Sequence, residues 1–233
     1  MSYLSLVIPC YNEEANLALL IPRCAELAGS GEIEVILVDN GSVDSTPRLL
    51  AELLLDVPGC RSVRVEKNQG YGFGILSGLR AAEGELVGWT HADMQTDPLD
   101  VRRGLDLFKR YGEDIFAKGR RHGRPLADVF FTVGMSIFET VLLGKPMWDI
   151  NAQPTLFSRK FFETWREPPH DFSLDVYAYY QAKLAGLPVH RFPVQFGERA
   201  HGVSRWNVNW AAKRKFIKRT AAFSLHMKRR IKP

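Results

Sequence analysis

The sequence predicts an α/β fold in which helices cover both faces of a mostly parallel sheet. Short apolar runs of strand type alternate with stretches of helical pattern through the first half of the chain, which is typical of this fold class. The 233 residues, 45% of them hydrophobic, are enough to build one large domain around such a sheet. Each strand predicted in this half ends in a polar or glycine-rich turn. Because parallel crossovers are right-handed, these turns are expected at one edge of the sheet.

Two strand-to-helix units open the chain. A strand is predicted at residues 4–9, and the polar segment after it starts a helix at Asn12 or Glu13. A second strand is predicted at residues 32–38, where EIEVILV is followed at once by a polar turn that begins with Asp39 and leads into the helix PRLLAELLL. Asp39 is therefore expected at the carboxyl edge of the sheet.

A third strand, at residues 61–66, runs into the glycine-rich turn NQGYGFG at residues 68–74, which opens another helix. Dinucleotide-binding folds cradle a pyrophosphate on a turn of this kind. Here the turn follows the third strand instead of the first, and it lacks the full GxGxxG spacing. A tight turn with close helix packing explains the glycines, so a dehydrogenase is not expected.

The segment ELVGWTHADMQTDP, at residues 85–98, carries the strongest candidate site. If its apolar part is a strand, His91, Asp93 and Gln95 continue it at a spacing of two and point to the same side. An imidazole, a carboxylate and an amide oxygen at this position can hold a divalent cation, Mg2+ or Mn2+. The alternative is that these residues begin a polar loop and cap the helix that Asp97 announces.

The second half of the chain has weaker patterns. The adjacent arginines 120 and 121 suit a phosphate oxyanion, although a solvated basic loop explains them as well. Near the start of a later helix, Asp171 and Asp175 are candidates for helix capping or for catalysis. Pro154 predicts that residues 148–159 form a loop or an edge strand. The other expected elements are a strand at 114–118, a helix at 128–143, a helix at 173–185 and a strand at 189–196.

Composition restricts the class of protein. The three cysteines are odd in number and form no CxxC pair, which argues against a disulfide framework or a zinc site and indicates a reduced, cytosolic chain. The first residues show no feature of a secretory signal, in agreement with a cytoplasmic location. The most apolar stretch, residues 126–143, is interrupted by Asp128 and Glu139 and is a poor membrane span.

The carboxyl-terminal segment is strongly basic. The whole chain has a net charge of +5, and no Asp or Glu occurs from residue 200 onward. A basic amphipathic helix is predicted at residues 207–233, and such a helix is typical of peripheral contact with an anionic membrane surface. Packing on the domain is the alternative, and nucleic acid is not expected because no nucleic-acid-binding fold precedes the helix. The apolar stripe of the helix is Phe216, Thr220, Phe223 and Met227.

Four segments together resemble the family-2 glycosyltransferases of GT-A fold. They are LSLVIPCYNEEANL, VDNGSVDST, the glycine-rich turn with AAEGELVGWTHADMQTDP, and FGERAHGVSRW. The resemblance covers about residues 3–206 in family order, and it is nearest to the dolichyl-phosphate mannose synthase and polyprenyl-phosphate glycosyltransferase branch. It implies a GT-A glycosyltransferase domain at residues 1–206, followed by the basic amphipathic helix at 207–233.

The resemblance implies a nucleotide-sugar donor site with a bound cation. His91, Asp93 and Gln95 occupy the family's metal motif, written D-A-D-x-Q, where a cation bridges the donor diphosphate and stabilises the leaving nucleoside diphosphate. His91 replaces the first Asp of that motif, and imidazole suits Mn2+ better than Mg2+. The implied donor-binding residues are Pro9, Tyr11, Glu13, Asp39, Asn68, Gly70, His91, Ala92, Asp93 and Gln95.

The implied catalytic residues come from several segments. Arg120 resembles the arginine of a G-x-R segment near the acceptor phosphate, and Arg199 begins an R-x-x-G-x-S-K pattern in which Arg205 replaces Lys. In the segment that begins at Asp149, Gln153 and Pro154 stand where the D-x-x-S-G-F pattern has Gly and Phe. The implied catalytic set is Asp93, Arg120, Asp171, Asp175, Arg199 and Arg205.

Three functional hypotheses fit these residues. The first is an inverting transfer of a sugar from a nucleoside-diphosphate donor to a polyprenyl-phosphate-type acceptor, which is already ionised and needs no base. The second is transfer to a hydroxyl of a glycan or small molecule, which needs a carboxylate base such as Asp171 or Asp175. The third is a catalytically silent sugar-nucleotide-binding protein, suggested by His91. The sequence does not determine an oligomeric state.

Overall fold

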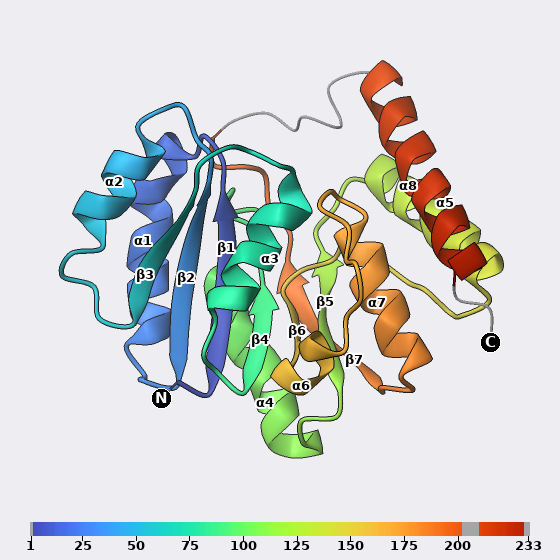
Figure 1. Cartoon of the computed structure of the whole chain (residues 1–233), viewed down its shortest axis with the longest axis horizontal. Helices are drawn as coiled ribbons and strands as arrows, with labels where there is room; N and C mark the ends of the chain where they lie inside the picture. The colour runs from blue at the N-terminus through green and yellow to red at the C-terminus, as the bar shows by residue number, and fades with distance from the viewer. Residues whose placement is uncertain (1, 202–209, 231–233) are drawn as a thin grey trace.

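The computed structural model describes residues 2–201 and 210–230, and its mixed sheet with helices on both faces confirms the predicted fold class (Figure 1). The strands are β1 (Leu4–Cys10), β2 (Ile33–Asn40), β3 (Cys60–Val65), β4 (Leu86–Trp89), β5 (Phe116–His122), β6 (Thr155–Ser158) and β7 (Val189–Gln195). The helices are α1 (Glu14–Ala28), α2 (Thr46–Leu53), α3 (Tyr71–Ala81), α4 (Val101–Tyr111), α5 (Leu126–Leu143), α6 (Arg159–Glu163), α7 (Leu174–Leu184) and α8 (Trp210–Arg230), with a 3-10 turn at Pro98–Asp100.

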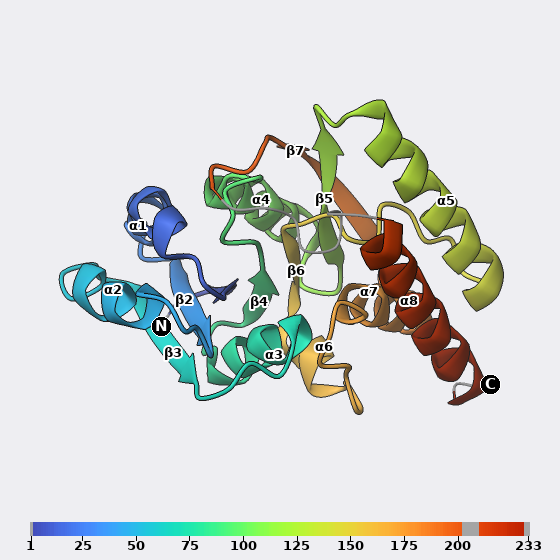
Figure 2. The same ribbon diagram turned by 90° about the horizontal axis from the view of Figure 1, so that it is seen from above.

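Side chains alternate between two cores, one on each face of the sheet. In β1, Leu6 and Ile8 pack with α1 and α4, whereas Val7 packs with α3 on the other face. This alternation follows from the period of two along a strand. Seen from above, α1 and α4 lie on one side of the sheet and α3, α6 and α7 lie on the other (Figure 2).

The strand order is β3-β2-β1-β4-β6-β5-β7. Strands β3, β2, β1 and β4 are parallel, so their carboxyl ends and the loops that follow them meet at one edge, as the sequence predicts. Beyond β4 the sheet becomes mixed, because β6 runs antiparallel to both β4 and β5. Open sheets bind their ligands at the carboxyl ends of the strands, which makes the β1, β2 and β4 ends the first place to look for a site.

The expectation that residues 148–159 form a loop or an edge strand holds for the loop at 148–154 and was wrong for residues 155–158. Residues Thr155–Ser158 form β6, which is buried throughout and pairs on both sides in the interior of the sheet. Pro154 directly precedes the strand, so its missing N–H removes no bond of the ladder, and its carbonyl accepts a hydrogen bond from the Gly119 N–H at 2.9 Å. The proline therefore marks the start of a central strand.

Helix α8 packs lengthwise on α5 (Figures 1 and 2). From the predicted apolar stripe, Thr220 and Met227 are buried and Phe223 is half-buried against the core, whereas the side chain of Phe216 lies outside the described residues. The described part of that stripe therefore faces the protein. The boundary at residue 206 also lies outside the described residues, so the division into 1–206 and 207–233 stays a prediction.

The contact between α5 and α8 contains a buried carboxyl group. Glu139 is fully buried, and its Oε1 accepts a hydrogen bond of 3.0 Å from the Ser224 hydroxyl. Burial raises the pKa of Glu139 from 4.5 to about 7, and the Ser224 hydrogen bond opposes this shift. No helix in the described part of the chain is both long and apolar enough to cross a bilayer.

The raised pKa predicts that Glu139 makes stability depend on pH. Between pH 4.5 and about 7, the folded state keeps the Glu139 proton and the unfolded state has lost it. The free energy of unfolding should therefore fall by up to about 1.4 kcal/mol per pH unit across this window, and the loss should be complete above pH 7. Glu139→Gln should remove this component, so that its advantage over the wild type grows from pH 5 to pH 7 in urea unfolding.

The exposed Glu163→Gln is the matched control for loss of a carboxylate. A difference between Glu139→Gln and the wild type that stays constant from pH 5 to pH 8 would contradict the assignment.

Candidate active site

The loops after β1 and β2 are joined into one unit at the carboxyl edge of the sheet. Asn12, with a φ of +58°, donates its N–H to the Ser42 hydroxyl at 3.0 Å and accepts the Val43 N–H at 3.0 Å. Asp39 is buried, and its Oδ1 accepts the Ser42 N–H at 2.9 Å. The Glu13 N–H is held by the Thr46 hydroxyl at 2.9 Å. These hydrogen bonds hold the two loops in place while Asn12, Glu13 and Val43 stay at least partly exposed, as a binding surface requires.

The other predicted donor-binding residues in this region lie on or beside the same edge. Pro9 is the second-last residue of β1, and Tyr11 follows the strand directly. Both residues are partly exposed. Asn68 accepts the Gly70 N–H at 2.9 Å through its side chain. Ala92 is buried in the core beneath the turn after β4, so it contributes packing.

The glycine-rich turn before α3 is shaped by a close approach of two backbones. Gly70 has a φ of +112°, and a Cβ atom there would lie 2.4 Å from the His170 carbonyl oxygen. At Gly72, a Cβ atom would lie 2.6 Å from the Pro169 carbonyl oxygen. Packing against residues 169–171 therefore accounts for these glycines, in agreement with the interpretation as a tight turn.

The strand predicted through the His91 motif was too long. Strand β4 ends at Trp89, and residues 91–97 form a turn in which Met94 has a φ of +58°. The side chains of this turn are consequently arranged by local bonds: Asp93 Oδ1 accepts the Gln95 N–H at 3.2 Å. The prediction that His91, Asp93 and Gln95 alternate along a strand was wrong, because Met94 turns the chain.

This turn is held against the loop that follows β7. Asp93 Oδ2 lies 3.0 Å from Arg199 Nη2, and the pair is largely shielded from solvent. Gln95 donates its side-chain amide to the Gly197 carbonyl at 3.3 Å, and its own carbonyl accepts the Gly197 N–H at 2.8 Å. Arg199 thus neutralises the carboxylate that the sequence assigns to a metal, and Arg205 lies outside the described residues.

Behind the turn, Asp175 faces a group of buried polar side chains. Burial raises the pKa of this carboxyl group, and the nearby Lys118 and His91 oppose the shift. Lys118 is fully buried, and its Nζ donates to the Ala152 carbonyl at 2.6 Å and to the Thr155 hydroxyl at 2.9 Å. Burial lowers the pKa of Lys118 to about 7, and the negative charge of Asp175 opposes this shift.

The electrostatic environment of His91 favours a neutral imidazole. Burial lowers its pKa, and the charges of Asp93 and Asp175 oppose this only in part. Its ring centroid lies 6.0 Å from that of Tyr71, whose hydroxyl accepts a hydrogen bond from the Gln153 amide. A neutral imidazole keeps a lone pair, which is the form that binds a metal ion.

The two candidate bases occupy different places. Asp175 is buried in the first turn of α7, and no side-chain capping bond is formed at that helix end. Asp171 instead accepts the Ser173 N–H at 2.9 Å and pairs with Arg219 of α8 at 3.1 Å. Asp171 therefore orders the loop before α7, whereas Asp175 faces His91 and Lys118.

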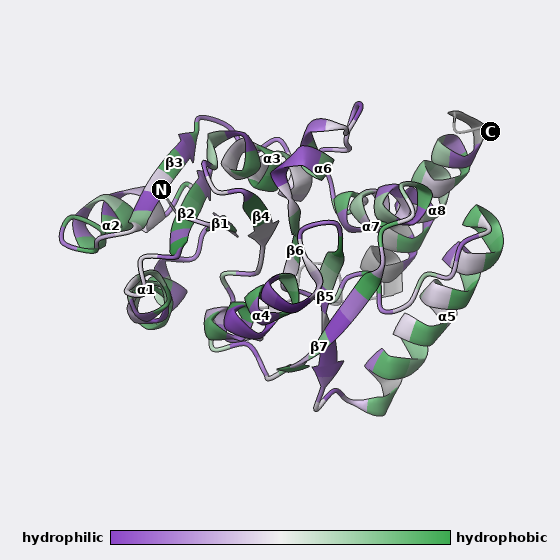
Figure 3. Ribbon diagram, turned by 90° about the horizontal axis from the view of Figure 1, so that it is seen from below, coloured by the Kyte–Doolittle hydropathy of each residue, from purple (hydrophilic) through white to green (hydrophobic). Residues whose placement is uncertain are grey.

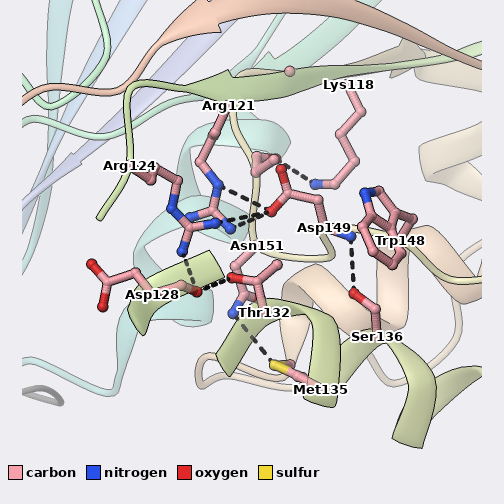
Figure 4. A network of polar contacts seen from close by, with 12 residues as sticks. Lys118, Arg121, Arg124, Asp128, Thr132, Met135, Ser136, Trp148, Asp149 and Asn151 are labelled. Carbon is pink, nitrogen blue, oxygen red and sulfur yellow. Dashed lines mark hydrogen bonds and ion pairs between the residues drawn. The ribbon is translucent and has the colours of Figure 1, made fainter. Parts of the chain in front are cut away.

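A second polar cluster surrounds Asp149 (Figure 4). Arg121 forms an ion pair with this buried carboxylate and donates Nε to its Oδ1 at 3.0 Å, and Arg124 Nη1 lies 3.8 Å from the same oxygen. Burial acts to raise the pKa of Asp149, but Arg121, Arg191 and Arg124 outweigh it and hold the pKa below its ordinary value. Both Arg121 and Arg124 also lie over the Phe196 ring, at 5.3 and 5.6 Å from its centroid.

The sequence analysis did not identify Lys118 or Arg124 as members of these clusters. It marked the pair Arg120 and Arg121 but did not choose Arg121. Arg120, which the resemblance selects, is exposed on β5. Alternation along a strand sends adjacent residues to opposite sides, and only the placement of β5 decides which side faces the site. The two adjacent arginines therefore indicated an anion-binding position, but the sequence alone did not show which of the two faces the site.

A family model described as glycosyl transferase family 2 matches residues 5–166, more than half of the chain. The chain belongs to this family. The match ends before α7, so it includes His91 and Asp93 but not Asp175 or Arg199.

Relatives of this family-2 chain include proteins described as undecaprenyl-phosphate sugar transferases. An undecaprenyl-phosphate 4-deoxy-4-formamido-L-arabinose transferase from Edwardsiella ictaluri is 36% identical over 216 residues, which cover 89% of this chain and 64% of that protein. The protein of the same description from Pectobacterium carotovorum is 40% identical over 166 residues, or 66% of this chain and 48% of the relative. The family-2 chain thus spans about half to somewhat under two thirds of these relatives.

Solved glycosyltransferases share the fold of this family-2 chain. Glucosyl-3-phosphoglycerate synthase from Mycobacterium tuberculosis with Mn2+ and UDP-glucose superposes with a TM-score of 0.70, at 21% identity over 97% of this chain and 79% of the other. A mannosyltransferase from Pyrobaculum calidifontis with GDP-mannose and Mn2+ gives a TM-score of 0.73, at 17% identity over 99% and 65% of the two chains. These likenesses confirm the GT-A fold.

The donor set of this family-2 chain fits a cation completed by its substrate. No cluster of three or more His, Cys, Asp or Glu side chains able to hold a metal ion occurs within residues 2–201 and 210–230. His91 and Asp93 nevertheless lie close enough to interact electrostatically, and a neutral imidazole with a carboxylate suits Mn2+. The remaining ligands would have to come from the donor diphosphate and water.

The Arg199 contact predicts competition between the guanidinium group and a cation. Arg199→Gln should free Asp93 Oδ2 and raise the Mn2+ affinity of the donor-free protein by about tenfold, since loss of a competing charge-assisted bond of about 1.4 kcal/mol has that effect. Asp93→Asn should abolish binding. Mn2+ titration followed by electron paramagnetic resonance measures both.

Arg64→Gln is the matched control, because it removes an arginine 3.8 Å from Asp39 at the same edge of the sheet. Unchanged or weaker Mn2+ binding by Arg199→Gln, relative to this control, would show that the arginine does not compete for Asp93.

Proposed function

We propose that this chain transfers a sugar, with inversion, from a nucleoside-diphosphate donor to a polyprenyl-phosphate-type acceptor. The observation that carries the proposal is the gathering of polar and charged side chains from the ends of β1, β2, β4, β5 and β7 at one edge of a family-2 domain. The undecaprenyl-phosphate specificity named for its relatives supports the acceptor class.

The donor half of the proposed site lies over the β1 and β2 ends. The joined loops around Asn12 and Ser42 form the proposed surface for a nucleoside, and the buried carboxylate of Asp39 is the proposed acceptor of a hydrogen bond from its base or ribose. Tyr11 and Glu13 flank this surface. The fold likeness to enzymes solved with UDP-glucose and GDP-mannose supports a nucleotide here.

His91 and Asp93 are the proposed holders of a divalent cation, and we assign Mn2+ over Mg2+ because of the imidazole. When bound, the cation supplies Lewis-acid stabilisation of the leaving nucleoside diphosphate. Gln95 acts on this turn mainly through its bonds to Gly197, which hold the loop after β7 against the proposed cation site. Arg199, once displaced from Asp93, becomes available to an anionic group.

The acceptor half is assigned to the region of Arg121 and Arg124. Their guanidinium groups are held side by side by Asp149 and Phe196, so two cations are oriented before a ligand arrives. Pre-oriented guanidinium groups suit the oxygens of a phosphate monoester. Because a phosphate acceptor is already ionised, this reaction requires no proton transfer to a carboxylate.

Transfer to a hydroxyl acceptor is a second candidate, favoured by Asp175 alone. Its carboxyl group is buried beside His91, and its raised pKa is a common property of a general base. Lys118 gives this carboxylate a structural reason to be present, however, since a nearby negative charge favours the charged form of a buried amine. The phosphate acceptor therefore remains the proposed one.

Turnover of Asp175→Asn distinguishes the two acceptor classes. With undecaprenyl phosphate in detergent, we expect the rate to stay within about tenfold of the wild type, whereas loss of a general base costs about a hundredfold to ten-thousandfold. The measurement is transfer of radiolabelled sugar from UDP- and GDP-sugars with Mn2+. Asp171→Asn is the control, and thermal unfolding of each variant checks that it folds.

A loss beyond a hundredfold in folded Asp175→Asn, with donor binding intact, would favour the hydroxyl acceptor. Donor binding without turnover on any acceptor, unaffected by Asp93→Asn, would favour a silent sugar-nucleotide-binding protein.

Peripheral attachment to the cytoplasmic face of a membrane belongs to the same proposal, because polyprenyl phosphates reside in bilayers. The exposed basic residues Arg214, Lys218 and Lys228 on α8 support contact with anionic lipid.

A further inference from the structure

The outer face of α5 is apolar along its whole length. Its two charged residues, Asp128 and Glu139, are respectively half-buried and buried, so neither lies among the exposed side chains. Hydropathy colouring shows α5 as a mostly hydrophobic helix at the periphery of the molecule (Figure 3). The exposed large side chains of α5 are Leu126 (78%), Val129 (39%), Phe130 (78%), Ile137 (57%), Phe138 (46%) and Val141 (76%).

Such a face is unusual for a helix that borders water. Surface helices direct their apolar stripe toward the core, whereas α5 buries Ser136 and Glu139 against the protein and exposes phenylalanine and isoleucine. Contiguous exposed apolar surface of this kind marks an interaction site. An 18-residue helix is about 27 Å long, so the face is extended enough to lie flat on another surface.

We propose that the outer face of α5 docks on a lipid bilayer that carries anionic headgroups. This inference rests on the proposed function, which places the acceptor in that bilayer. The face is the side of a single helix and not a groove, and it therefore fits a fluid surface into which side chains can sink. The tail helix that the sequence selects for this role instead turns the described part of its apolar stripe to α5.

The charges beside the face favour an anionic bilayer. Helix α8 packs along α5 and contains no acidic residue, and Arg214, Lys218 and Lys228 are exposed on it. Lysine and arginine near a membrane surface each contribute about 1 kcal/mol of attraction to anionic lipid. Trp148, which follows the carboxyl end of α5, is 53% exposed and is suited to the headgroup zone.

A second copy of this chain is the less fitting occupant. Stable dimers bury about 800 Å² on each partner. One helix face with six exposed apolar side chains offers only a few hundred Å². Lysine and arginine on the adjacent α8 would also face their own copies across a symmetric contact, which adds repulsion.

Docking through α5 would place the proposed acceptor cations at the bilayer. Helix α5 is bonded to their cluster at two places: Arg124 donates to the Asp128 carbonyl at 3.1 Å, and the Asp149 N–H donates to the Ser136 hydroxyl at 3.1 Å (Figure 4). A helix lying in the headgroup zone therefore carries Arg121 and Arg124 to the depth of a lipid-linked phosphate.

Vesicle flotation of the full-length protein tests the proposal. Vesicles of phosphatidylcholine with 30% phosphatidylglycerol should bind the wild type, and Phe130→Glu and Val141→Glu should each weaken the partition at least tenfold, about 1.4 kcal/mol. Leu55→Glu, which adds the same charge at a 79% exposed leucine after α2, should bind like the wild type. Binding of both α5 variants at wild-type strength would overturn the proposal.

Two further measurements separate this proposal from the proposed function. Turnover of a water-soluble short-chain polyprenyl phosphate should be unchanged in Phe130→Glu, while turnover of undecaprenyl phosphate in vesicles should fall. If Phe130→Glu turns over the soluble acceptor and also binds vesicles as strongly as the wild type, the proposed docking surface is wrong and the proposed function is unaffected. A wild type that binds no vesicles but is oligomeric, and becomes monomeric in Phe130→Glu on size exclusion, would assign the face to self-association and overturn docking on lipid.

Discussion

The burial of the Lys118 amino group is the constraint on which the candidate site depends. The group is fully buried between β5 and the segment that enters β6, where the Ala152 carbonyl and the Thr155 hydroxyl receive its hydrogen bonds. The charges of Asp175 of α7 and Asp149 favour its charged form, but burial outweighs them and lowers its pKa to about 7. Lys118 thereby links β6, through Thr155, to the polar cluster around Asp175 and to the polar cluster around Asp149. The placement of His91 against Asp175 belongs to the same arrangement.

The two halves of the site are built by different means. On the parallel half, hydrogen bonds between neighbouring loops fix the edge, as between Asn12 and Ser42. On the mixed half, charges far apart in sequence hold one another, as in the pairs of Asp93 with Arg199 and Asp149 with Arg121. A site of this kind joins a donor region ordered by hydrogen bonds between loops to a charged region ordered by charge-assisted bonds between distant segments.

Helix α5 reverses the usual polarity of a surface helix. The inner contact contains Glu139 and Ser224, joined by a hydrogen bond, whereas large apolar side chains of α5 point outward. In water this arrangement is unfavourable, because apolar area stays hydrated while a carboxyl group is desolvated. Against a bilayer the outward area is buried, and the basic residues of α8 meet the headgroups. The proposed membrane contact thus gives the outward apolar side chains of α5 a physical explanation.

The sequence by itself determined the fold class, the family and the parallel half of the site. Apolar periodicity located β1 to β4, and the geometry of parallel strands then required Asp39 and the His91 turn to share an edge. Tertiary structure decided the rest: the central place of β6, the choice of Asp175 over Asp171 as the carboxylate facing His91, and the role of Lys118. Periodicity is a local property of the chain. Charge compensation and strand insertion depend on which distant segments become neighbours, and no local pattern encodes that.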